Sequence, residues 1–350
     1  MNILILTAAV GGGHSSAAKA LAAGFVELGG DSHNVHIVDY MEHYAPFPFP
    51  HMARMYAAVV RHPALWHMIY TSTNTARGWV LNAQTIALAM EAGMARLLGE
   101  YSPDIIVATH PLGAPALNSL LYRRRQALPY YTVVTDIGNV HTWWAYPFGE
   151  MWFAPCEESA QYLVRSGLPA RQVVNSGLPV HPRFSHPMRP VAETRQMLGL
   201  SPDRFTILLM GGADGVGPLA EVAQALAGEP APWQLVVICG RNRALKEQLE
   251  RQACQWAIPV RIEGLVDDVP SYMQAADVLV TKGGPQTLSE GLACGLPMLV
   301  THMLPGQEEE AFSHFERLGV ARRLTHPCEV RRALDRLAAP DSPELQQLRL

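Results

Sequence analysis

The chain of 350 residues has a formal net charge of −4, with 49% hydrophobic and 17% charged residues. This length exceeds that of a usual single-core domain, so two domains are expected, and the apolar composition excludes a disordered chain. The small negative charge gives no electrostatic reason to expect a nucleic-acid partner.

The chain also lacks an obvious export or membrane-spanning segment. Its first apolar stretch, residues 2–6, is far too short to cross a bilayer, and no later stretch is long and apolar enough. The five cysteines are scattered, without a CxxC pair, which indicates a reducing compartment and supplies no metal framework. We therefore expect a cytoplasmic protein that meets the inner face of the cell membrane from the side.

The first predicted strand, residues 2–6, leads into the glycine turn Gly11-Gly12-Gly13 and then into His14 and a helix of small residues. Glycines let the backbone approach a ligand, and a helix start favours a neutral, basic imidazole. The turn is not a full GxGxxG motif, so the dinucleotide fingerprint is incomplete. His14 is either a base that faces a ligand or a residue that caps the turn.

Aromatic and cationic residues are interspersed from residue 44 to residue 79. This mixture is typical of a segment that contacts a bilayer with anionic lipid. A pair of helices whose apolar face is simply part of the core would give the same pattern.

Two further predicted strands end in polar residues. Residues 104–108 are followed by His110, and residues 131–134 are followed by Asp136, with His141 and Trp143 in the next loop. Ligands of open α/β sheets bind at the carboxyl ends of the strands, so these side chains are candidates for a site.

A proline-rich stretch, residues 177–190, is the best candidate for a linker. It predicts an N-terminal domain of residues 1–178, a linker of residues 179–190 and a C-terminal domain of residues 191–350. The second half again alternates strands and helices, and Gly211-Gly212 follows its first strand.

The stretch of residues 281–310 combines a tight turn at residues 282–285 with a short predicted helix. Its amide groups suit a phosphate, and Glu290, one turn after Thr287, could accept hydrogen bonds from ribose hydroxyls. Gln307 and Glu308 follow the next strand and could hold sugar hydroxyls. An ordinary βαβ unit with a glycine turn and a polar loop remains the alternative.

Several motifs together resemble a glycosyltransferase family that includes monogalactosyldiacylglycerol synthases, bacterial processive diacylglycerol glucosyltransferases and, more distantly, the lipid II N-acetylglucosaminyltransferase. They occur in the expected order over most of the chain: GGGHSSAA (Gly11–Ala18), VTDIGNVHTWW (Val134–Trp144), SGLPVHPRF (Ser176–Phe184), LLMGGADGVGP (Leu208–Pro218) and TKGGPQTLSEGLACGLPMLVTHMLPGQEE (Thr281–Glu309).

The resemblance implies an α/β protein of the GT-B type, with two Rossmann-like domains facing across a cleft and a last helix that packs back on the first domain. It implies an inverting transfer of galactose or glucose from UDP-galactose or UDP-glucose to diacylglycerol, without a bound metal or other cofactor, and anionic membrane lipids as further partners. The chain agrees in having no Asp-x-Asp motif. A UDP-sugar epimerase of the same shape and a non-catalytic protein that binds UDP-sugar or lipid are the alternatives.

The resemblance also assigns roles by position. His14 and Asp136 match the catalytic residues, and the acceptor side matches Gly12, Gly13, His110, His141 and Trp143. The donor side matches Gly211, Gly212, Leu265, Val266, Lys282, Gly284, Gln286, Thr287, Glu290, Gln307 and Glu308. The chain departs from the pattern at Gln286, where the diacylglycerol enzymes commonly have glycine in a GPGT sequence.

Overall fold

The computed structural model describes residues 1–60, 62–138, 140–186 and 188–348, and it forms two compact units. The side chains of Asp31, Pro63 and residues 76–82 are also outside the description, as are Asn139 of the predicted acceptor loop and residue 187 of the predicted linker. The first unit comprises Met1–His181 and Pro305–Glu310, and the second comprises Pro182–Leu304 and Ala311–Leu350.

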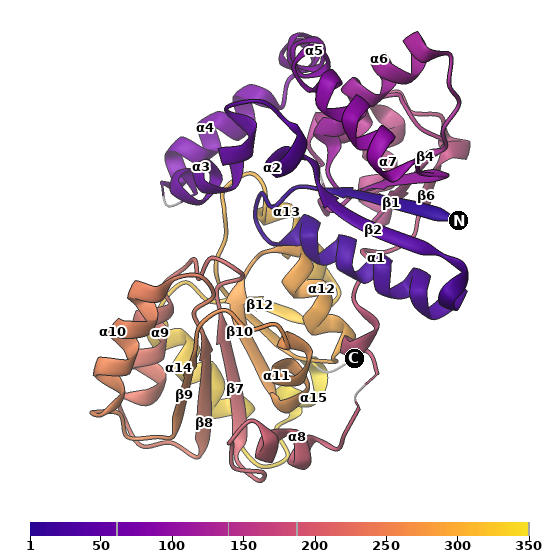
Figure 1. The fold of residues 1–350 in the computed structure, drawn as a ribbon. Helices are drawn as coiled ribbons and strands as arrows, with labels where there is room; N and C mark the ends of the chain where they lie inside the picture. The colour runs from indigo at the N-terminus through magenta and orange to yellow at the C-terminus, as the bar shows by residue number, and fades with distance from the viewer. Residues whose placement is uncertain (61, 139, 187, 349–350) are drawn as a thin grey trace. The chain divides into compact units, whose positions relative to one another are not determined.

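The first unit contains a six-stranded parallel sheet in the order β2-β1-β3-β4-β5-β6 (Figure 1). Its strands are β1 (Asn2–Thr7), β2 (Asn34–Asp39), β3 (Ile105–Ala108), β4 (Tyr130–Val133), β5 (Met151–Ala154) and β6 (Val173–Asn175). Its helices are α1 (Gly13–Gly29), α2 (Tyr40–Tyr44), α3 (Met52–Val59), α4 (Pro63–Thr73), α5 (Ala76–Tyr101), α6 (Ala114–Arg124) and α7 (Glu157–Arg165).

Both faces of this sheet are buried, which explains why residues 3–6 of β1 are all apolar. Leu4 and Leu6 pack on one face with side chains of α5 and α6, while Ile3 and Ile5 pack on the other face with Ala18 of α1. The faces are therefore filled with apolar side chains, and polar groups that could bind a ligand are confined to the ends of the strands.

The second unit repeats this architecture with the strand order β12-β11-β10-β7-β8-β9, again all parallel. Its strands are β7 (Phe205–Met210), β8 (Trp233–Ile238), β9 (Val260–Glu263), β10 (Val278–Lys282), β11 (Met298–His302) and β12 (Ala321–Arg323). Its helices are α8 (Val191–Met197), α9 (Leu219–Ala227), α10 (Arg243–Ala253), α11 (Val269–Ala275), α12 (Pro285–Ala293), α13 (Glu309–Arg317), α14 (Pro327–Leu337) and α15 (Pro343–Leu348). The predicted pair of Rossmann-like α/β domains is confirmed.

The last helix, α15, packs on the second unit. Glu344 forms ion pairs with Arg322 of β12 and Arg336 of α14, and Leu348 joins the core beneath α9 and α14. The sequence resemblance implied a last helix that returns to the first domain, whereas the described part of α15 is held by its own unit.

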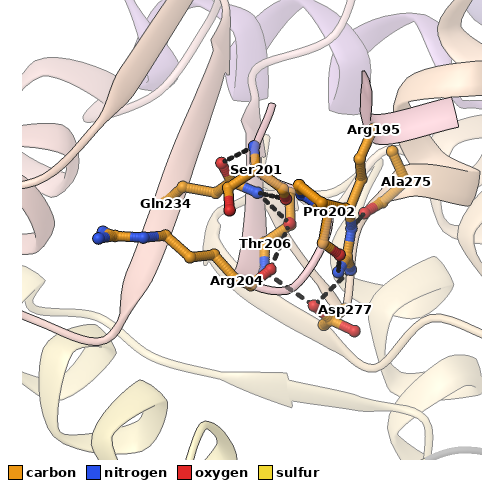
Figure 2. A network of polar contacts seen from close by, with 8 residues as sticks. All are labelled: Arg195, Ser201, Pro202, Arg204, Thr206, Gln234, Ala275 and Asp277. Atoms are coloured by element: carbon orange, nitrogen blue, oxygen red, sulfur yellow. Dashed lines mark hydrogen bonds and ion pairs between the residues drawn. The ribbon is translucent and has the colours of Figure 1, made fainter. Parts of the chain in front are cut away.

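A buried polar network fastens α8 to the amino ends of the second sheet (Figure 2). Arg195 of α8 donates a hydrogen bond of 2.7 Å to Oδ2 of Asp277, which also accepts one of 2.8 Å from the backbone N–H of Thr206. The other two nitrogens of the Arg195 guanidinium group, Nε and Nη1, donate hydrogen bonds to the carbonyl oxygens of Ala275 and Pro202. Because this end of the sheet is opposite the strand termini that carry the predicted ligand residues, the network serves stability.

We predict that Asp277→Ala lowers the free energy of unfolding of the second unit by about 2–4 kcal/mol, because it leaves the buried Arg195 guanidinium without its carboxylate. Urea unfolding, with hydrogen exchange of β7 amides as a probe of this unit, measures the change. The control is Glu250→Ala, which removes an exposed pair with Lys246 on α10 and should cost at most about 0.5 kcal/mol. Equal effects of the two substitutions would contradict the role of the network.

Candidate active site

His14 lies at the start of α1, directly after the glycine turn, and the ends of two neighbouring strands fix its ring. Its Nδ1 is 2.8 Å from the carbonyl oxygen of Thr109 and 2.9 Å from Oγ1 of Thr135. Since a carbonyl oxygen can only accept, Nδ1 must carry the proton, which leaves a lone pair on Nε2. Burial lowers the pKa of His14, partly opposed by the charge of Asp136, so the ring is a neutral base.

Asp39, at the end of β2, holds the backbone just before the glycine turn. Its Oδ2 accepts a hydrogen bond of 2.7 Å from the N–H of Ala9, while its Oδ1 accepts from the N–H groups of Met41 and Glu42 at the start of α2. A dinucleotide-binding fold would use this carboxylate for a ribose. Here it holds the backbone, in agreement with the incomplete fingerprint in the sequence.

His110 stands beside His14, with the ring centroids 4.8 Å apart in an edge-to-face arrangement. Its Nδ1 is 2.7 Å from the hydroxyl of Tyr40, which is fully buried. Burial lowers the pKa of His110 well below its usual value, and the neighbouring His14 lowers it further. Two adjacent imidazoles are therefore neutral at physiological pH, which avoids two positive charges side by side.

Asp136 follows β4, and two side chains orient it. Nε1 of Trp144 donates a hydrogen bond of 2.8 Å to its Oδ2, and the Ser159 hydroxyl donates to its carbonyl oxygen at 3.2 Å. The Trp144 ring is also 6.0 Å from the ring of His14. The structure thus brings the predicted His14, His110 and Asp136 together at one edge of the sheet.

The carboxyl end of α4 is attached to the loop that carries His141 and Trp143. Nε2 of His141 is 3.2 Å from Oγ1 of Thr73, and Oδ1 of Asn74 accepts a hydrogen bond of 2.8 Å from the N–H of Thr142. Nδ1 of His141 in turn accepts from the N–H of Trp143 at 3.3 Å. Burial lowers the pKa of His141 to about 4. The aromatic segment is therefore bound to the predicted acceptor loop.

The segment Pro305–Glu310 belongs to the first unit, although the chain on both sides of it belongs to the second. Gly306 has a φ of +81°, and a Cβ there would lie 3.3 Å from the ring of Tyr70 and 3.4 Å from His67, both on α4. Glu308 is 3% exposed. The structure thus groups Gln307 and Glu308 with the first unit, beside α4.

The remaining predicted donor residues follow three strands of the second sheet. Gly211 and Gly212 come directly after β7, and Lys282 ends β10, with its Cε 3.2 Å from the position of a Cβ on Gly212. Leu265 and Val266 follow β9, and Leu265 is 58% exposed. Because these strands are parallel and lie in one sheet, the residues share its carboxyl edge.

Helix α12 begins at this edge, with Gly284 just before its first turn and Gln286 and Thr287 within it. The amide groups of such a helix start favour an anion. Glu290, one turn later, is buried, and Nε2 of Gln286 donates a hydrogen bond of 3.1 Å to its Oε1. Burial raises the pKa of Glu290 to about 7, although the amide of Gln286 opposes the rise.

Sequence reasoning missed the residues that orient this site. Thr109 and Thr135 directly precede the predicted His110 and Asp136, and Trp144 directly follows the predicted Trp143. Their positions beside the candidates were the only signal available, since their contacts with His14 join parts of the chain about a hundred residues apart.

No described helix is long and apolar enough to cross a membrane. The apolar side chains that α3 and α4 expose belong instead to short amphipathic helices. They are Met55, Leu65 and Met68, with Phe47 just before α3.

Comparisons with known proteins cover most of the chain. Residues 14–180 match the family model of monogalactosyldiacylglycerol (MGDG) synthase, and residues 206–319 match that of the glycosyltransferase family 28 C-terminal domain. The chain is 34% identical to a chloroplastic monogalactosyldiacylglycerol synthase of Spinacia oleracea, with 98% of this chain and 67% of that protein covered. The chain is 32% identical to monogalactosyldiacylglycerol synthase 1 of Arabidopsis thaliana, with 98% of this chain and 66% of that protein covered. The chain thus spans about two thirds of the length of these relatives.

Solved structures with the same fold include Anabaena HepE in complex with UDP-glucose, with a TM-score of 0.59, 15% identity and 99% and 92% of the two chains covered. MurG of Acinetobacter baumannii has a TM-score of 0.59 and 13% identity, with 100% of this chain and 93% of that chain covered. A UDP-GlcNAc 2-epimerase from Neisseria meningitidis bound to UDP-GlcNAc has a TM-score of 0.61 and 13% identity, with 100% of this chain and 94% of that chain covered. At this identity the likeness shows the fold alone, which is of the GT-B type.

One expectation from the sequence is wrong. The names of the relatives place those proteins in the chloroplast, which overturns a location on the inner face of a cell membrane. That expectation rested on the lack of an export signal in the chain. Such a lack carries no information on location when the relatives are longer by a third of their length.

We predict that the low pKa of His141 makes the first unit sensitive to acid. The unfolded chain binds a proton on this ring near pH 6.5 and the folded chain only near pH 4, so stability is lost as the pH falls between these values. His141→Asn should reduce this pH-dependent loss by about 2–3 kcal/mol. Urea unfolding at pH 7 and pH 4 measures it, with the exposed His43→Asn as control. A pH dependence unchanged by His141→Asn would refute the assignment.

Proposed function

Because the chain belongs to the monogalactosyldiacylglycerol synthase family, we propose that it transfers galactose from UDP-galactose to the free hydroxyl of diacylglycerol. The observation that carries this proposal is the match of both halves of the chain to glycosyltransferase models, together with a partly buried neutral histidine at the acceptor edge. The chain is 34% identical to a monogalactosyldiacylglycerol synthase, whereas its likeness to the epimerases shows the fold alone, which favours the transferase over the epimerase.

The donor lies on the second unit in this proposal. The diphosphate would meet the amide groups at the start of α12 and the glycine turn after β7, which act as fixed dipoles on a developing negative charge. The Glu290 carboxylate would accept hydrogen bonds from the ribose hydroxyls. Leu265 and Val266 would flank the uracil, since their exposed loop lies at the same sheet edge.

The acceptor lies on the first unit. Nε2 of His14 would take the proton of the alcohol as its oxygen attacks C1 of galactose, while UDP leaves from the opposite face with inversion. Thr109 and Thr135 hold the ring in the required tautomer, and Asp136 stabilises the imidazolium that forms. Lys282 and the helix dipoles of the second unit would meet the leaving-group charge, so the reaction needs no bound metal.

The exposed apolar side chains on α3 and α4 would contact the lipid surface that supplies the acceptor, and Arg54 beside them would favour anionic lipid. The attachment of α4 to His141 would then link that contact to the acceptor loop.

We predict that the purified chain, incubated with diacylglycerol vesicles and UDP-galactose, forms a monogalactosyl lipid and releases one UDP for each product molecule. Product mass by mass spectrometry identifies the transfer, and a parallel incubation with UDP-glucose tests donor choice. Consumption of UDP-sugar to a new UDP-sugar, without a glycolipid, would instead establish an epimerase. Binding of UDP-galactose without turnover would establish a non-catalytic protein.

We predict that His14→Ala lowers kcat by about 10²–10⁴-fold, because a positioned general base contributes that much, while the Kd for UDP stays unchanged. Thr135→Val should have a smaller effect on kcat, since the carbonyl of Thr109 still fixes the ring. Steady-state kinetics and calorimetric UDP binding give the two quantities. Full activity of His14→Ala would remove this residue as the base.

A further inference from the structure

Gln286 and Glu290 form a buried pair on α12, at positions four residues apart on one face of the helix. Their side chains are 6% and 8% exposed, and the amide Nε2 lies 3.1 Å from the carboxylate Oε1. On an exposed helix such a pair contributes little, because water competes for both groups. Burial removes that competition, so this hydrogen bond to a charged acceptor is among the strong ones.

Close packing against the sheet restricts shifts of helix α12 as a whole. Gly291 follows Glu290, and a Cβ on it would lie 2.8 Å from Sδ of Met298 on β11 and 3.1 Å from Cδ2 of Leu279 on β10. This face of α12 is therefore in direct contact with the apolar sheet. One turn after Glu290, Sγ of Cys294 donates to the carbonyl oxygen of Phe184. The direction of the Glu290 carboxylate is left to its own side-chain torsions and to its hydrogen-bond partner.

We propose that Gln286 is a positioning residue for donor binding: its amide orients the Glu290 carboxylate for the ribose hydroxyls and favours its ionised form. This inference rests on the proposed function, in which Glu290 holds the ribose. The contact uses Oε1 and leaves Oε2 for the ligand. The diacylglycerol enzymes that the sequence resembles commonly have glycine at this position. Glycine has no side chain that could contact Glu290, so this positioning role is specific to a chain with glutamine here.

The electrostatics of the site agree with this role. Burial disfavours the charged carboxylate, and the N–H of Gln286 favours it. The titratable group beside Glu290 on the same helix is the Cys294 thiol, whose pKa is raised to about 12 by burial and by the Glu290 charge. That thiol stays neutral between pH 6 and pH 9. From the neighbouring strand β10, Lys282 is the charged group that lies at the same edge.

The test is a double-mutant cycle on the full chain, with UDP-galactose binding measured by calorimetry at pH 7 and pH 9 without acceptor. The variants are Gln286→Met, which keeps the volume but removes the amide, Glu290→Ala, and the two combined. We expect Gln286→Met to raise Kd about three- to tenfold at pH 7 and less than about twofold at pH 9, where the carboxylate is ionised without help. In the Glu290→Ala background it should change Kd by less than about twofold.

The cycle separates this inference from the function on which it rests. Equal effects of Gln286→Met with and without Glu290, at either pH, would show that Gln286 contacts the donor directly or merely packs, and the inference would fall. An effect that requires Glu290 but is the same at both pH values would support the orienting role and overturn the effect on ionisation. Unchanged binding by Glu290→Ala would overturn the ribose role itself, and with it the donor site proposed above. Gln286→Ala, checked by circular dichroism, serves as the second variant if the methionine disturbs the fold.

Discussion

A parallel sheet covered on both faces leaves polar side chains room only at the ends of its strands, and both units of this chain depend on that constraint. In the first unit, the residues after β1, β3 and β4 meet at one edge because β3 lies between β1 and β4 and pairs with both in parallel. In the second, the glycine turn after β7 and the start of α12 after β10 meet for the same reason. The chemistry is concentrated where the packing stops, while the opposite edge of the second sheet holds the Arg195 network that stabilises the unit.

Burial gives the two edges opposite electrostatic characters. In the first unit it keeps His14, His110 and His141 neutral, which costs stability as the pH falls below their ordinary values. In the second it raises the pKa of Glu290, so the folded unit binds a proton more readily than the unfolded chain, and stability declines as the pH rises from 4.5 towards 7. Each edge thus carries an ionisable group whose charged form is disfavoured by burial, histidine in the first unit and Glu290 in the second.

The sequence was sufficient for the two-domain α/β fold, because continuous apolar strands alternate with glycine turns and helices over the whole chain. It also predicted that His14, His110 and Asp136 lie together, since each follows a strand and such residues converge at a sheet edge. It could not identify Thr109 and Thr135 as the partners of His14, because these contacts depend on strand order. Nor could it assign Gln307 and Glu308 to the first unit, since their neighbours in the chain are β11 and α13 of the second. The location failed for a different reason: it was argued from a missing signal and from scattered cysteines, and neither separates a reducing cytoplasm from another reducing compartment.

The fold alone does not separate a transferase from an epimerase, since the solved neighbours include an epimerase with a similar TM-score. The difference must therefore lie in what the first unit presents to the reacting sugar. An epimerase acts on the bound nucleotide sugar itself and needs no binding surface for a second substrate. Here Tyr56 of α3 lies 3.4 Å from the position of a Cβ on Gly11, and Thr73 of α4 contacts His141, so both helices border the residues around His14. Helices that carry exposed methionine and leucine side chains and also border the residues around His14 are suited to guide a lipid alcohol to this edge, which a water-soluble substrate would not require.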